Sequence, residues 1–360
     1  MKLKNHWRFL AVFLFLLVSL LILEQTKTLA RKDNWPVMLN ASRRMEVAMA
    51  AVREEKLNRG YKISPIDDPN QTGMIGEPYT EITTTLGNLE AKRSTANPNT
   101  AAMVVDMLTQ CGAEKGDTVA VNLSSSFPCL NLAVLCALDA MELKGIVINS
   151  VGASTYGANL PDFTYLDMEH FLVERQYLSN HSTFFSLGGQ DDIGKEMPEE
   201  TKKAIVSRLS GFGYKFLYYE DLDENIAVRQ SIYEAGAEPA CFINAGGNLM
   251  GFGGGTEMVS AVNGIILPGK SPVKGHGLIP LFLNRGVPVI HLLNMKGLLP
   301  AYGLPFEPSP IPAAGEGGVY DTWQYHLPLA VGLLLTGLVL LIWAAKKYPR
   351  TEEHTSELQS

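Results

Sequence analysis

The sequence predicts an α/β fold: a doubly wound, mostly parallel sheet with helices on both faces, flanked by two transmembrane helices. Through the middle of the chain, short apolar segments rich in β-branched residues alternate with segments of helical length, which is typical of parallel strands buried on both faces. Longer apolar segments lie near both ends. A content of 46% hydrophobic and 19% charged residues excludes a disordered chain, and a mean hydropathy of +0.05 excludes a polytopic transporter.

The first apolar segment, 9–24, follows basic residues and Trp7, a residue type that anchors spans at the membrane interface. It is short but workable as a transmembrane helix, which needs about 17–25 residues. A cleaved signal peptide is the alternative, because it too combines a charged start with an apolar core. Charged residues directly after the core and a poor cleavage site at 28–30 favour an uncleaved anchor.

The predicted domain spans 25–296 and contains an early helix over 40–57, for which Asn40 can act as the cap. A loop rich in Pro, Gly, Asp and Asn follows over 61–77, and a second helix begins at Pro98 and ends at Gly112. Strands and helices then alternate. The predicted strands are 118–123, 145–149, 183–187, 215–219, 240–244, 264–267 and 287–292. The predicted helices are 128–143, 165–178, 198–210, 222–235 and 276–285.

Beyond the domain, five prolines between 297 and 318 predict a semi-rigid tether over 297–326. The second apolar segment, 327–345, is framed by aromatic residues and followed by a basic flank, 346–351, as in a membrane span. Basic residues also precede the first span, over 1–8. We therefore expect a protein of the cell membrane with both termini cytoplasmic and the large domain extracytoplasmic.

Residues 352–360 resemble the translation of a sequencing-adapter oligonucleotide. We expect this segment to be an artefact and the native C-terminus to be missing beyond about Thr351, so the segment is excluded from the fold prediction.

Charge and motifs exclude several classes of function. The net charge is −7, so no basic surplus exists to bind nucleic acid. Histidines occur in no spacing typical of a metal site, and the glycine-rich stretch 246–255 lacks the spacing of a nucleotide-binding loop, so we expect neither a metal nor a cofactor. Cys129 and Cys136 lie seven residues apart on one predicted helix and cannot pair, so we expect buried free thiols.

Small and polar residues follow several predicted strands. Because the carboxyl ends of parallel strands meet at one edge of a sheet, these loops are expected to line a single cleft. The residues that we expect to bind a ligand there are Ser124, Ser125, Ser126, Asn149, Ser150, Gly246, Gly247, Asn248 and Lys270.

The run Ser124–Ser126 lies between a predicted strand and a helix with Pro128 in its first turn. Three interpretations remain open: the serines cap the helix, bind an anion at its positive end, or include a nucleophile. Candidate catalytic residues are thus Ser124, Ser125 and Ser126, with His276 and Asp191 as candidate acids or bases. The pair Asp191-Asp192 is more typical of a solvated turn.

Three motifs resemble one known family. They are Asn-Leu-Ser-Ser-Ser-Phe-Pro at 122–128, Gly-Ala-Ser-Thr-Tyr-Gly-Ala-Asn at 152–159 and Asn-Ala-Gly-Gly at 244–247. The chain is similar in these motifs and in its layout to the poly-gamma-glutamate system protein family. The resemblance implies a membrane-anchored accessory of poly-γ-glutamate capsule biosynthesis or export. The implied partners are the poly-γ-glutamate synthase membrane complex, the anionic polymer and the lipid bilayer. The resemblance transfers no catalytic residue.

Two functions from different classes stay open. In the first, the domain is a non-catalytic module that handles the polymer or its assembly machinery, with glutamate carboxylates bound by the cations Lys270, Lys274, Arg285 and Lys296. In the second, a serine of 124–126 serves a hydrolase or transpeptidase that acts on poly-γ-glutamate or another envelope polymer. A histidine oriented by an acid beside that serine would favour the enzyme.

Overall fold

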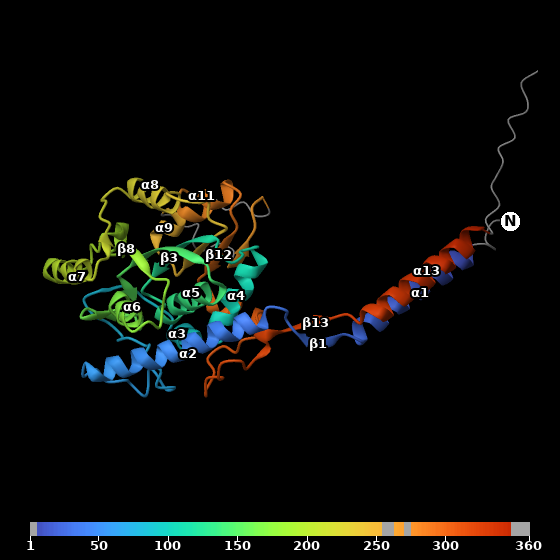
Figure 1. The fold of residues 1–360 in the computed structure, drawn as a ribbon, viewed down its shortest axis with the longest axis horizontal. Coiled ribbons are helices and arrows are strands. Elements are labelled where there is room, and N and C mark those ends of the chain that lie inside the picture. Colours follow the sequence, from blue (N-terminus) through green and yellow to red (C-terminus); the bar gives the residue numbers. More distant parts are fainter. Residues whose placement is uncertain (1–5, 254–262, 270–274, 347–360) are drawn as a thin grey trace, which may run out of the picture. The chain divides into compact units, whose positions relative to one another are not determined.

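The computed structural model describes residues 6–253, 263–269 and 275–346. It consists of two compact units, one formed by the two ends of the chain, up to Lys32 and from Asp321, and the other by Asp33–Tyr320 (Figure 1). Several predictions concern residues outside the described ranges: the ligand-binding role of Lys270, the cation Lys274, the end of the glycine-rich stretch, most of the basic flank 346–351, and the segment 352–360.

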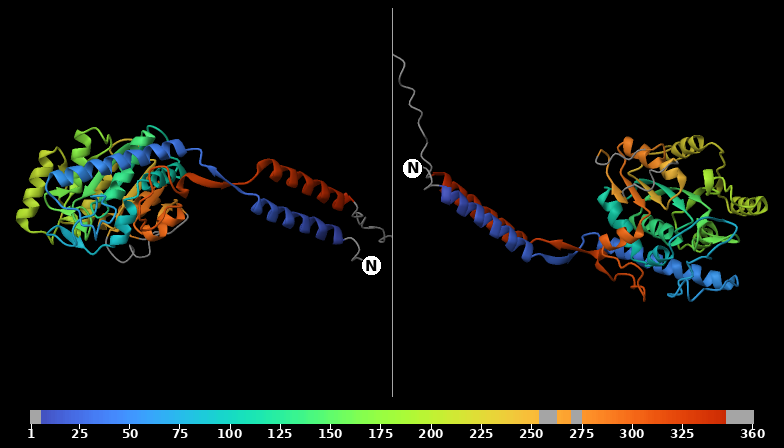
Figure 2. Two further views of the ribbon diagram at one scale, coloured as in Figure 1. Left: turned by 90° about the horizontal axis from the view of Figure 1, so that it is seen from below. Right: turned by 180° about the vertical axis from the view of Figure 1, so that it is seen from behind.

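The terminal unit pairs the first and last elements of the chain. Helix α1 (His6–Gln25) lies side by side with α13 (Leu327–Lys346), and strand β1 (Thr28–Arg31) pairs antiparallel with β13 (Asp321–Gln324) (Figures 1 and 2). The two helices are antiparallel, so the start of α1 and the end of α13 lie together, and the rings of Trp7 and Trp343 meet there edge-on, 6.2 Å apart. Both helices are long and apolar enough to cross a membrane.

The large unit is an α/β domain around one mostly parallel sheet, which confirms the predicted class. Seven described strands lie in the order β11-β12-β10-β3-β4-β8-β9, and each neighbouring pair is parallel except β11–β12. Their bounds are β3 Thr118–Ser124, β4 Lys144–Ser150, β8 Ser182–Ser186, β9 Lys215–Phe216, β10 Cys241–Ala245, β11 Gly264–Ile266 and β12 Val289–Leu292.

Side chains that alternate along the central strand enter two separate cores. Val119, Val121 and Leu123 belong to a cluster with helices α2 (Trp35–Asn58), α4 (Thr100–Gln110) and α5 (Pro128–Met141). Ala120 belongs to a second cluster with α8 (Leu222–Tyr233), α9 (Leu249–Phe252) and α11 (Leu278–Asn284). Because successive strand residues point to opposite faces, apolar groups are buried on both faces of the sheet.

Smaller elements complete the domain. Short strand pairs are β2 (Thr83–Thr85) with β5 (Ala153–Ser154) and β6 (Asn159–Leu160) with β7 (Phe163–Thr164). The remaining helices are α3 Leu89–Thr95, α6 Tyr165–Glu174, α7 Glu199–Gly211, α12 Met295–Ala301, and the 3₁₀ turns η2 Gln190–Asp192 and η3 Gly318–Tyr320. All four cysteines are free thiols, and Cys129, Cys136 and Cys241 are buried.

Two predictions about the ends of the domain are wrong. The first helix begins at Trp35, with Pro36 in its first turn, so Asn40 lies inside the helix and is not its cap. The segment 297–320 is not a tether, because α12 extends into it, η3 lies within it, and Leu304, Val319 and Tyr320 are buried in the first core cluster. Apolar residues between the prolines thus hold this segment onto the domain up to Tyr320.

Candidate functional site

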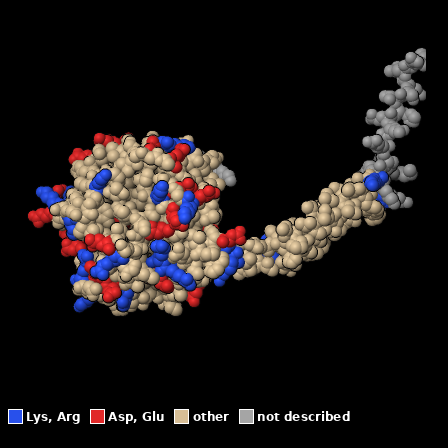
Figure 3. Space-filling model, viewed as in Figure 1, with Lys and Arg blue, Asp and Glu red and all other residues tan. Residues whose placement is uncertain are grey.

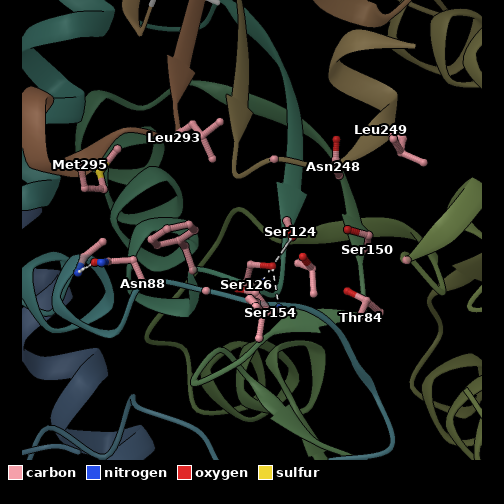
Figure 4. A pocket seen from close by; sticks show the side chains of 18 of the residues that line it. Thr84, Asn88, Ser124, Ser126, Ser150, Ser154, Asn248, Leu249, Leu293 and Met295 are labelled. Atoms are coloured by element: carbon pink, nitrogen blue, oxygen red, sulfur yellow. Dashed lines mark hydrogen bonds between the residues drawn. The ribbon is translucent and has the colours of Figure 1, made fainter. Parts of the chain in front are cut away.

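A cavity of about 840 Å³ opens at the carboxyl edge of the sheet (Figure 4). Its wall contains residues that follow β3, β4, β8, β10 and β12, which is the arrangement expected when parallel strands end at one edge. A segment that the sequence did not associate with the site, 84–88, forms another part of the wall; it comprises the end of β2 and the loop that leads to α3. The cleft therefore lies where the sequence placed it, with an additional wall.

The predicted ligand-binding residues divide into two groups. Those that line the cavity are Ser124, Ser126, Ser150, Gly247 and Asn248. Ser125 and Asn149 are buried, and the Ser125 hydroxyl donates to Asn149 Oδ1 at 3.2 Å. Gly246 adopts φ +95°, a left-handed conformation that suits glycine in the turn after β10.

The predicted acids and bases do not lie with the serines. Asp191 forms an ion pair with Lys195, and the His276 side chain is exposed just before α11. Neither residue belongs to the described wall of the cavity. Arg285, a predicted cation for the ligand, forms an ion pair with Glu234 instead, also outside that wall. The roles predicted for Asp191, His276 and Arg285 therefore lack support in the geometry.

The serine run does not cap α5. The residue before the helix is Phe127, and Pro128 occupies the first turn, where its lack of an N–H costs nothing. Instead the Ser124 hydroxyl donates to Ser126 Oγ at 3.1 Å, and the backbone N–H of Ser154 donates to the same Ser126 oxygen at 3.0 Å (Figure 4). The run thus joins the ends of β3 and β5 on one side of the cavity.

Lys92 and Ser154 form a contact that the sequence did not suggest. Lys92 lies on α3, is 1% exposed, and places its Nζ 2.8 Å from Ser154 Oγ, which lines the cavity. The same amine donates to the backbone carbonyl of Ser126 and lies 4.5 Å from the centre of the Phe127 ring. Burial lowers the pKa of Lys92 from 10.5 to about 7. The amine is therefore poised to change its protonation state near neutral pH.

A buried polar network supports the floor of the site. Arg229 is fully buried and donates to Asp192 Oδ2 at 2.6 Å and to Asn122 Oδ1 at 3.0 Å. The Asn122 amide donates in turn to Asn248 Oδ1, in the cavity wall, at 2.8 Å, and to Asn244 Oδ1 at 2.7 Å. Asn248 also caps α9 by accepting from the N–H of Gly251. The network thus fixes Asn248 relative to the strand ends.

His291 closes this network at the neighbouring strand. Its Nδ1 lies 3.1 Å from the amide nitrogen of Asn244, and burial lowers the pKa of His291 from 6.5 to about 4. The imidazole is therefore neutral at physiological pH, and its Nδ1 accepts from the Asn244 amide. A neutral, buried histidine in this position orients a side chain and carries no charge toward the cavity.

The exposed surface of the cavity wall is mostly apolar, with hydroxyl and amide groups within it and little charge. Among its described residues Lys296 is the only lysine or arginine, and none is an aspartate or glutamate. Lys296 is exposed and has no ion-pair partner within the described part of the chain. Across residues 6–253, 263–269 and 275–346, no group of three or more His, Cys, Asp or Glu side chains could hold a metal ion. The hydroxyls, amides and Lys296 can contact polar or anionic atoms of a ligand, and the apolar part of the wall can contact its hydrocarbon groups.

Comparisons of the chain with family models, with curated proteins and with solved structures find no match.

Proposed function

We propose that the protein is a membrane-anchored accessory of bacterial poly-γ-glutamate biosynthesis or export, and that the cleft of its α/β domain binds the anionic polymer. The observation that carries this proposal is the wall of the cleft, where Lys296 supplies positive charge and no described carboxylate opposes it. The volume of about 840 Å³ falls within the range of about 300–1,000 Å³ that is usual for ligand sites.

The donors in the wall match the repeating chemistry of the polymer. Each γ-linked glutamyl unit presents one carboxylate and one amide, both of which accept hydrogen bonds. The hydroxyl of Ser126 and the amide of Asn294 can donate to such acceptors. The hydroxyls of Ser124 and Ser150 donate to Ser126 Oγ and to the carbonyl oxygen of Leu123 and would have to rotate to reach a ligand. Gly189 and Gly247 are half-buried in the wall and carry no side chain, which permits close approach of an extended chain.

We further propose that the sheet is doubly wound, with its crossover beside β3. The chain passes outward from β3 through β4 and β8 to β9, then returns to β10 on the other side of β3 and continues to β12. In sheets of this kind the crevice beside the crossover is the usual ligand site. Ser124 after β3 and Asn248 after β10 flank this point and both line the cavity.

The terminal unit supports membrane anchoring with both chain ends on one side. The outer ends of α1 and α13 lie together (Figure 2), and charged side chains are almost absent along the pair on the face shown in Figure 3. The basic residues before α1 and after α13 favour a cytoplasmic location of this side, with the domain outside. There the domain would meet polymer that emerges from the synthase membrane complex.

The proposal is tested with the full chain in lipid nanodiscs and a fluorescent γ-glutamate oligomer, by fluorescence polarisation at low and high salt. Removal of one exposed charge contact costs about 0.5–1 kcal/mol, so Lys296→Ala should weaken binding about two- to fivefold. The control Lys115→Ala removes a lysine that pairs with Glu142 on the surface and should leave binding unchanged. Equal affinity of wild type and Lys296→Ala, or no loss of affinity at high salt, would contradict the proposal.

The second candidate, a serine-dependent hydrolase or transpeptidase, gains support from a different serine. The hydroxyls of Ser124 and Ser126 contact each other, and that of Ser125 contacts Asn149. Ser154, another serine of the cavity wall, has the amine of Lys92 2.8 Å from its hydroxyl oxygen.

A further inference from the structure

We propose that Ser154 and Lys92 form a nucleophile–base pair in the wall of the cleft, which cleaves acyl bonds of the bound polymer. A lysine amine can activate a serine hydroxyl when the two are within hydrogen-bond reach and the amine is neutral. The choice of γ-glutamyl amides as the substrate rests on the proposed function, whereas the pair itself rests on the geometry of the two side chains.

The contact has the geometry that proton transfer requires. Lys92 Nζ lies 2.8 Å from Ser154 Oγ, within the range of about 2.6–3.2 Å expected for a general base and its nucleophile. Ser154 is 5% exposed and lines the cavity, and Lys92, which is 1% exposed, lies behind it on α3. A substrate in the cleft could thus reach the hydroxyl, and the base would remain shielded from water.

The surroundings of Lys92 favour the neutral amine. Burial lowers its pKa to about 7, and no described carboxylate is among the groups that oppose this shift. The amine donates one hydrogen to the carbonyl oxygen of Ser126. In the neutral form, the lone pair can then accept the hydrogen of the Ser154 hydroxyl.

Lys56 is a second buried lysine, and its contacts are those of a structural residue. Lys56 donates to the carbonyl oxygens of Gly73 at 3.0 Å and Ile75 at 2.7 Å, and thereby ties α2 to the loop beside it. Burial also lowers the pKa of Lys56, with Asp68 acting in the opposite direction. The Lys56 amine contacts these backbone carbonyls, whereas the Lys92 amine also contacts a hydroxyl in a cavity wall. Lys56 is therefore a matched control.

Gly87 leaves the approach to Ser154 open. A Cβ atom added at Gly87 would lie 2.7 Å from Ser154 Oγ and 3.0 Å from Lys92 Cε, and Gly87 itself lines the cavity. Any larger residue would press on both members of the pair. The absence of a side chain here preserves the contact and the space in front of it.

The reaction balances with these two residues and water. Ser154 Oγ attacks the carbonyl carbon of the amide while its proton passes to Lys92 Nζ, which becomes an ammonium. The C–N bond then breaks, Lys92 returns the proton to the leaving amine, and an ester links the acyl group to Ser154. Water attacks this ester, Lys92 accepts a proton from the water, and its transfer to Ser154 Oγ releases the carboxylic acid and restores the pair.

The test measures the reaction of Ser154 with a fluorophosphonate probe on the full chain in nanodiscs, with the labelled residue identified by mass spectrometry. The wild type should be labelled at Ser154, at a rate that rises with pH around a midpoint near 7. Lys92→Met should lower the rate about 100-fold or more, since a general base contributes on that order. Lys92→Arg should lower it similarly, because arginine keeps the positive charge but cannot act as the base. Lys56→Met should leave the rate unchanged.

Two further measurements test the inference even if the Lys92 variants fail to fold. The first is the pH profile of the labelling rate of the wild type, which requires no substitution. Gly87→Ala should slow labelling while both residues of the pair are retained, because the added Cβ would press on Ser154 Oγ and Lys92 Cε. No labelling at Ser154, labelling at another serine, or a rate independent of pH between 6 and 9 (a window of about one to two units around the pKa) would overturn the inference.

The substrate is tested separately by the chain length of poly-γ-glutamate after incubation with wild type and Ser154→Ala. Probe labelling without polymer shortening or binding would retain the pair and reject the proposed function. Polymer binding that depends on Lys296, without labelling of Ser154, would reject the pair and retain the proposed function.

Discussion

Replacement of Arg229 by methionine tests whether the polar network under the cleft is a structural foundation. The guanidinium is fully buried and donates to Asp192 Oδ2, Ser186 Oγ, Asn122 Oδ1 and Asn225 Oδ1 at 2.6, 2.8, 3.0 and 3.1 Å. Methionine fills similar space but leaves the buried carboxylate of Asp192 without its counter-ion. Loss of one partner from a buried pair costs about 3–5 kcal/mol, which is a large part of a typical stability of about 5–15 kcal/mol.

The assay is pulse proteolysis of the full chain in detergent across a urea series, which reports unfolding of the domain. Arg229→Met should lower the free energy of unfolding by about 3–5 kcal/mol. Adding Asp192→Asn removes the uncompensated charge and should recover about 1–3 kcal/mol. Asparagine also tolerates the φ of +66° at this position.

The matched control is Lys115→Met, which breaks an exposed ion pair with Glu142 and should cost at most about 1 kcal/mol. A loss for Arg229→Met no larger than that of the control would refute the reasoning. A double variant less stable than Arg229→Met alone would show that the buried charge of Asp192 is not the source of the cost.

Three other perturbations follow from the structure. Tyr320→Phe removes a hydroxyl that lies 2.6 Å from Asn99 Oδ1 and 2.8 Å from Ser42 Oγ, and should cost about 1–3 kcal/mol; an unchanged urea midpoint would contradict the packing of 302–320 onto the domain. For Lys92, the unfolded chain binds more protons than the folded chain between the folded pKa of about 7 and the ordinary 10.5. Stability should therefore rise with pH in that window, and a Lys92→Met variant that rises just as steeply from pH 7 to 9 would contradict the buried amine. In intact cells, a cysteine at Lys115 should react with a membrane-impermeant maleimide and an epitope at the N-terminus should stay protected from added protease; the reverse pattern would invert the proposed orientation.

The sequence predicted the elements whose signal is local. The alternation of apolar strands and helices in 118–292 located the parallel sheet, and the loops after the strands located the cleft, because a shared sheet edge brings together residues that follow different strands. The prolines of 297–318 predicted a tether, because proline favours extended spacers locally. The burial of Leu304 and Val319 in the core of the domain outweighs this local preference.

The contacts that define the site could not be predicted in the same way. Lys92 and Ser154 lie 62 positions apart in the sequence, on elements that meet through β2 and β5, a strand pair too short to predict from its pattern. The burial of Arg229 could not be predicted from the sequence. Its ion-pair partner Asp192 is also buried, although the sequence had suggested a solvated turn at this position. One local feature of the sequence could have predicted α3, the helix that carries Lys92. Asn88 is a typical cap residue, and its side chain accepts from the N–H of Ala91 at 2.7 Å.

Hydrogen–deuterium exchange of the full chain with and without poly-γ-glutamate tests most directly whether the cleft at the sheet edge binds the polymer. We expect slower exchange in peptides that cover 84–88, 247–249 and 293–296, which form the wall of the cavity. Unchanged exchange in all three segments at saturating polymer, or protection confined to a distant helix such as α7, would contradict the account.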